Sequence, residues 1–149
     1  MKAATIPNDA KQVGATGVER AAMLYARVAL GTAFLSAVAG RFGIWDRSID
    51  WAHFERFMRR TAEVNAFMPA FTIPFLAWAA TALEISCGIA LIVGVQLRWT
   101  ALASALLLAM FAVAMAISTG IKPPLDYSVF SASAGALLLA LRASRNTNG

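Results

Sequence analysis

Charged residues are scarce in this sequence. They make up 14% of the 149 residues, whereas 59% of the residues are hydrophobic. A soluble domain normally carries about 25% charged residues, so this composition excludes an ordinary water-soluble domain and indicates a membrane protein. The formal net charge of +5 does not indicate nucleic-acid binding, because the basic residues lie at the ends of apolar stretches, as they do in membrane proteins.

Cysteine and histidine are almost absent as well. One cysteine, Cys87, excludes an intrachain disulfide, and one histidine, His53, excludes a bis-histidine haem or a His/Cys zinc site of ordinary spacing. The sequence also shows no nucleophile–base pair and no nucleotide-binding loop, so catalytic residues stay unknown and an independent enzyme is not expected. We expect no metal and no covalently bound cofactor, and a redox role would then need a partner protein or a diffusing quinone.

Several apolar stretches are long enough to cross a bilayer, which takes about 20 residues. The four candidates are 21–44, 71–95, 99–119 and 125–141. They predict an all-α membrane protein, a bundle of four transmembrane helices. The membrane domain would span 21–142, between a polar N-terminal tail at 1–20 and a polar C-terminal tail at 143–149.

The connection between the first two stretches has a pattern of its own. Apolar residues recur there at helical spacing, with basic and acidic residues between them: Ile49, Phe54, Phe57, Met58 and Val64 against Arg56, Arg59, Arg60 and Glu63. Asp50 is a suitable N-cap for this segment. The pattern predicts a short amphipathic helix, which either lies on the membrane surface or covers the end of the bundle.

The Lys and Arg distribution predicts the orientation. The N-terminal tail, the 96–99 turn and the C-terminal tail together carry slightly more basic residues than the opposite side, which predicts both termini in the cytoplasm of a multi-pass inner-membrane protein. Tyr25 and Trp99 would mark one membrane interface, and Trp45 and Tyr127 the other.

A cleavable signal peptide is an alternative for the first stretch. The small residues at 37–39 resemble a cleavage site. The polar segment before the stretch is about 20 residues long, however, and Arg27 interrupts the apolar core, which a signal peptide does not tolerate well. A membrane-spanning helix is therefore the favoured interpretation.

Glu84 lies in the middle of the second stretch. A lone carboxylate at this depth costs roughly 2.5–3.5 kcal/mol on insertion scales, so we expect a basic side chain from a neighbouring helix to compensate it. Small residues share its helix face at steps of three and four: Ala77, Ala80, Thr81, Cys87 and Gly88. Arg27 in the first stretch is the predicted partner, and Arg41, close to the same helix face, would point into the bundle from the opposite end.

Two interpretations of these charges remain open. In the functional one, Glu84 and the two arginines line a polar pocket that binds a quinone head group or passes a proton. In the structural one, a buried pair locks two helices together. A pocket open to lipid beside Glu84 would favour the quinone, a continuous wet path would favour transport, and a dry, fully paired Glu84 would favour a scaffold. Lys122, Asp126 and Tyr127, at the outer end, are secondary candidates.

Two segments carry a family pattern. "RVALGTAFLSAVAGRFGIW" has an arginine, a small and apolar run, then a glycine and a basic residue, and "LEISCGIALIVGVQLRW" contains Glu84, Gly88, Gly94 and Arg98 in that order. These segments resemble the DoxX family of small inner-membrane proteins, over about 22–142. The ending "LRASRNTNG" departs from the glycine-rich, acidic ending of many members.

The resemblance implies an inner-membrane protein that works with redox enzymes, as the DoxD-like subunit of thiosulfate:quinone oxidoreductase does. The first hypothesis is a membrane subunit of an oxidoreductase system that anchors a soluble or membrane-bound redox partner and contacts the quinone pool. The alternatives are a small-solute transporter or channel subunit, which would need to form a homo-oligomer because four helices are few for a transporter, and a non-catalytic membrane scaffold.

Overall fold

The computed structural model describes residues 8–47 and 49–147 of the chain. All regular structure within these residues is helical, which confirms the predicted all-α class. In chain order the elements are α1 (Asn8–Arg41), α2 (Trp51–Val64), the 3-10 turn η1 (Ala70–Thr72), α3 (Ile73–Val93), α4 (Leu97–Thr119), α5 (Lys122–Asp126) and α6 (Val129–Thr147).

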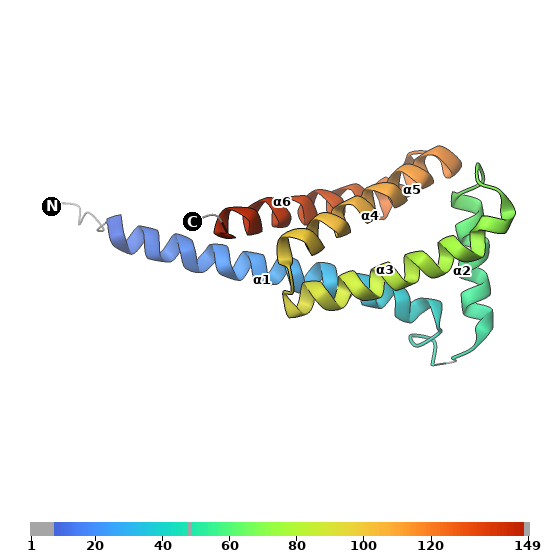
Figure 1. Ribbon diagram of the computed structural model, residues 1–149, viewed down its shortest axis with the longest axis horizontal. Coiled ribbons are helices and arrows are strands. Elements are labelled where there is room, and N and C mark those ends of the chain that lie inside the picture. The colour runs from blue at the N-terminus through green and yellow to red at the C-terminus, as the bar shows by residue number, and fades with distance from the viewer. Residues whose placement is uncertain (1–7, 48, 148–149) are drawn as a thin grey trace.

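The four long helices run side by side along the length of the molecule (Figure 1). α1 packs against α3, α4 packs against α6, and further contacts join α3 to α4 and α1 to α6. The α3–α4 turn and the end of α6 lie toward one end, and the first part of α1 extends beyond them, whereas α2 lies across the other end. The short connection between α3 and α4 makes these two helices antiparallel neighbours.

Three of the helices are long and apolar enough to span a membrane. The candidate spans are Gly17–Arg41, Ala70–Val93 and Leu97–Thr119. The predicted fourth span is not confirmed, because the apolar part of α6, Val129–Ser144, is shorter than a span and Arg142 lies within it. α6 nevertheless carries exposed leucines such as Leu138, which is 68% exposed.

The predicted amphipathic helix is present as α2. Asp50 is its N-cap: the side chain accepts a hydrogen bond from the backbone N–H of His53 at 3.2 Å. Its apolar face packs against α1, α3 and α4, and Phe54 on that face is only 2% exposed. The Ser118 hydroxyl of α4 donates to the Val64 carbonyl at 2.8 Å. Of the two predicted arrangements, the structure therefore has α2 covering the end of the bundle.

Small residues allow α1 and α3 to approach closely. A Cβ atom on Gly31 would lie 2.6 Å from the Cγ1 atom of Ile92 and 2.8 Å from the carbonyl oxygen of Gly88. The predicted small face of the second span is buried at Ala77, Thr81, Cys87 and Gly88 along with Glu84. Helix packing by small residues is typical of membrane bundles, and here it brings the α1 backbone next to the face that carries Glu84.

Candidate functional site

Glu84 is paired with Arg41 from the last turn of α1. The Nη2 atom of Arg41 donates to both carboxylate oxygens, at 2.6 Å and 2.7 Å, and its Nη1 atom donates to the Thr81 hydroxyl at 3.0 Å. Glu84 itself is 2% exposed. The expectation of a buried carboxylate compensated by a basic side chain of the neighbouring helix is confirmed, but the predicted partner, Arg27, was wrong.

Arg27 instead binds the end of α3. Its Nε atom donates to the Leu91 carbonyl and its Nη2 atom to the Ile92 carbonyl, both at 3.0 Å. These carbonyls belong to the last turn of α3, which ends at Gly94 with a φ of 85°. The last carbonyls of a helix lack intrahelical partners and carry partial negative charge. They are a nearer acceptor for Arg27 than a carboxylate at mid-helix, which explains the wrong prediction.

The environment of Glu84 favours the structural interpretation. Its two oxygens both accept hydrogen bonds from Arg41, and the side chain is almost completely buried. Among the described residues, no buried side-chain nitrogen or oxygen lacks a hydrogen-bond partner. A buried carboxylate with both oxygens paired is the arrangement that we expect of a clamp between α1 and α3.

Arg41 also contacts the aromatic residues that fix α2 on the bundle. Its guanidinium lies 3.8 Å from the centre of the Phe57 ring, a distance at which a cation is attracted to the ring face. Phe54, beside Phe57, has its ring 5.6 Å from that of Phe42 and 4.5 Å from that of Trp78. The same arginine therefore joins α1 to α3 through charge and to α2 through stacking.

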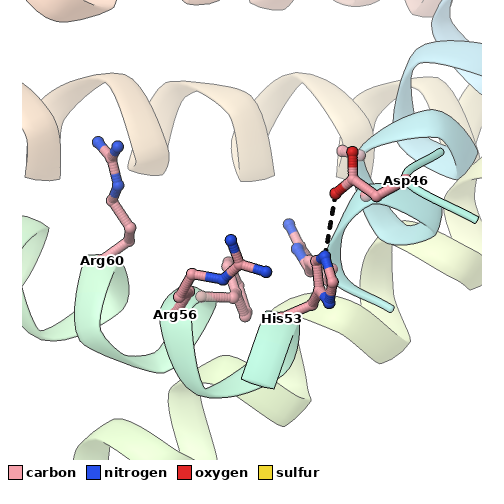
Figure 2. Close-up of a pocket in the computed structure, with 8 residues that line it drawn as sticks. Asp46, His53, Arg56 and Arg60 are labelled. Carbon is pink, nitrogen blue, oxygen red and sulfur yellow. Dashed lines mark hydrogen bonds and ion pairs between the residues drawn. The ribbon is translucent and has the colours of Figure 1, made fainter. Parts of the chain in front are cut away.

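An open pocket of about 430 Å³ lies between the end of α1, the loop after it and α2. Figure 2 shows the residues that line it. It is lined by Ala37, Gly40, Arg41, Asp46, His53, Arg56, Phe57 and Arg60. Arg56 and Arg60 extend from successive turns of α2, and Asp46 faces His53 from the loop after α1 (Figure 2). We refer to this hollow as the arginine pocket.

His53 holds the loop after α1 to the start of α2. Its Nδ1 atom lies 2.8 Å from an oxygen of Asp50, its Nε2 atom lies 2.9 Å from an oxygen of Asp46, and its side chain is 9% exposed. The hydrogen bond with His53 lowers the pKa of Asp50 below its ordinary value. The described residues include no group of three or more histidine, cysteine and acidic side chains that could hold a metal ion.

The secondary candidates do not join this site. Lys122 and Asp126 form an exposed ion pair with each other, one turn apart in α5, and Tyr127 is 70% exposed. None of the three lines the arginine pocket. The members that sequence reasoning missed are His53, Arg56 and Arg60. Their spacing along one helix face, with Asp46 and Asp50 just before it, was the available signal.

The chain matches one family model, described as methylamine utilisation protein MauE, over residues 19–126. No curated protein and no solved structure matches it significantly. The match covers well over half of the chain and overturns the DoxX resemblance.

The residues behind the DoxX resemblance have general structural roles. Glu84 forms the buried pair, Gly88 permits close helix packing and Gly94 ends α3 in a left-handed conformation. Any small membrane bundle with a buried ion pair needs residues of these kinds. Their order along the chain therefore does not distinguish one such family from another.

Proposed function

This chain belongs to the MauE family of methylamine utilisation proteins, and from that premise we propose that it is an integral membrane subunit of a redox system, holding a partner protein at the α2 end of the bundle. The family description supports a redox setting, because methylamine is a reduced compound whose carbon can be oxidised. With both termini in the cytoplasm, as the Lys and Arg distribution predicts, this end would face outward from the inner membrane.

One observation carries this proposal: the polar groups inside the bundle bind each other, whereas those that face outward lie at α2. Inside the bundle, Arg41 binds Glu84 and Thr81, and Arg27 donates to two carbonyls of α3. The arginine pocket, in contrast, opens to the outside. This division supports a role through binding at the α2 end rather than through a polar path along the bundle.

Photo-crosslinking tests the partner. A photoreactive residue at Glu55, exposed on α2, should give an adduct in intact membranes with a protein that carries a redox cofactor or a redox-active disulfide. The matched control is the same residue at Val113, exposed on α4 within a candidate span, which should crosslink to lipid only. The proposal is wrong if Glu55 gives no protein adduct, or if the identified protein has no redox group.

We include a quinone contact in this proposal and locate it at the arginine pocket rather than at Glu84. Both oxygens of Glu84 are already occupied. A guanidinium has five N–H groups, and only some of those of Arg41 donate to Glu84 and Thr81. The remaining N–H groups can donate to a quinone carbonyl. The pocket lies beside the end of a candidate span, within reach of a lipid-soluble ring.

A change in the pocket wall tests the quinone contact without touching the buried pair. Ala37→Leu fills part of the pocket, whereas Ala33→Leu, one turn earlier in α1 at another exposed position, does not line it. We expect Ala37→Leu to weaken binding of a short-chain quinone to the purified protein by about tenfold, or about 1.4 kcal/mol. Equal affinities of the two variants would refute the contact.

A further inference from the structure

Two arginines of the arginine pocket have no acidic partner among the described residues. Arg56 donates only to the Ala52 carbonyl of its own helix, at 3.3 Å, and Arg60 takes part in no ion pair of the described chain. The two lie four residues apart on α2, where like charges repel. A bound anion would relieve this repulsion.

The acidic groups nearest to the pocket are already used. Glu84 neutralises Arg41, and Asp46 and Asp50 both bind His53. The carboxylate of Asp46 keeps its charge when it binds His53, so the three arginines that line the pocket outweigh Asp46 and Glu84 by one positive charge. Guanidinium groups match the oxygens of a phosphate or carboxylate through paired hydrogen bonds, so the chemistry of this excess charge favours an oxyanion.

Exposed aromatic residues place the pocket at the level of lipid headgroups. Two tryptophans lie at this end of the bundle: Trp45 and Trp51 are each more than half exposed. Tryptophan side chains gather at the interface between membrane and water. Moreover, the candidate span in α1 ends at Arg41, one wall of the pocket.

We propose that Arg56 and Arg60 bind the phosphate of an anionic phospholipid in the arginine pocket. The pocket volume of about 430 Å³ admits a headgroup, and its open mouth lets the acyl chains remain in the bilayer. The phosphate would share this pocket with the proposed quinone, but its test needs neither a partner protein nor a quinone, so the two proposals can fail separately. It assigns to α2 a lipid contact that would hold this helix at the membrane surface.

Native mass spectrometry of the protein released from nanodiscs tests the site. In discs of mixed phosphatidylglycerol and phosphatidylcholine, the wild type should retain phosphatidylglycerol preferentially. Arg60→Gln should lower this retention by about tenfold, as expected when a charged hydrogen-bonding partner is lost. Arg59→Gln is the matched control, because it removes the same charge from the preceding residue of α2, which does not line the pocket. This variant should retain lipid like the wild type.

Three outcomes would overturn the proposal. Equal losses in Arg59→Gln and Arg60→Gln would indicate diffuse attraction to the charge of α2. Displacement of the lipid by millimolar inorganic phosphate would identify a site for the free anion. Wild-type lipid retention by Arg60→Gln, together with loss of the Glu55 crosslink, would assign the arginines to an acidic segment of a protein. Two controls separate these outcomes from misfolding. Arg60→Lys keeps the charge and should restore part of the lipid binding, and the circular dichroism of each variant should show the helical signal of the wild type.

Discussion

Charged side chains in the interior of the bundle have partners within the chain, whereas two arginines at its α2 end have no acidic partner among the described residues. Inside, Arg41 and Glu84 bind each other, and Arg27 binds two backbone carbonyls. At the α2 end, Arg56 and Arg60 face an open pocket with no acidic partner in the described chain. Arginine therefore has a partner within the chain in one region and no acidic partner among the described residues in the other.

Burial explains this difference. A charge removed from water needs a partner with good geometry, because its desolvation costs about several kcal/mol. An exposed arginine keeps its hydration and can remain without a partner at little cost. We therefore assign the interior charges to the stability of the fold, and we propose that the charges of the α2 end serve binding. Substitutions in the two regions should consequently have very different effects.

The largest expected effect comes from breaking the interior pair on one side. Arg41→Leu leaves the Glu84 carboxylate buried and unpaired, and should lower the free energy of unfolding by about 3–5 kcal/mol. The double variant Arg41→Leu with Glu84→Leu should recover most of this loss, since a well-packed apolar pair replaces the ions. Unfolding in a denaturing detergent measures both. A double variant as unstable as the single one would contradict the structural role of the pair.

The next effect concerns the backbone contact that brings the pair together. Gly31→Ala places a Cβ atom 2.8 Å from the Gly88 carbonyl oxygen, so the helices must separate, at a cost of about 1–3 kcal/mol. Gly135→Ala in α6 is the control, because a Cβ atom there meets nothing within 4 Å. Equal thermal stabilities of the two variants would show that α1 and α3 do not need this close approach.

A surface ion pair should matter far less than the interior one. Lys122→Gln removes the exposed pair with Asp126 in α5, and should change the free energy of unfolding by about 0.3–0.5 kcal/mol at most. The same detergent titration measures it. If Lys122→Gln lowered the free energy of unfolding nearly as much as Arg41→Leu, exposure to water would not explain why the two regions differ.

The smallest expected effect depends on pH and lies at the start of α2. The bond with His53 lowers the pKa of Asp50, so the stabilising effect of its charge is present above the ordinary carboxyl pKa and is lost as the pH falls through the lowered value. Asp50→Asn keeps a residue able to cap α2 but removes the charge. The melting temperatures of wild type and variant should differ slightly at pH 7 and converge once the pH falls below the lowered pKa of Asp50. A constant difference would contradict the assignment.

Local patterns in the sequence predicted much of this molecule correctly. Hydropathy indicated a helical membrane protein, the Asp50 cap and the alternating residues after it predicted α2, and the small residues around Glu84 predicted its buried face. Each of these features depends on residues within a few turns of one helix. Such patterns did not settle the fourth span, because the apolar part of α6 is shorter than a bilayer-spanning helix and apolarity alone does not show whether it crosses the membrane.

The amino-acid sequence by itself determined that a buried acid in this chain needs a basic partner, because the cost of burying a charge does not depend on the fold. Only the tertiary structure decided which arginine supplies it. Arg27 and Arg41 lie on nearly the same face of α1, and the register of α1 against α3 places Arg41 beside Glu84 and Arg27 beside the last carbonyls of α3. The arginine pocket has the same origin, since it forms only where the end of α1, the loop after it and α2 come together.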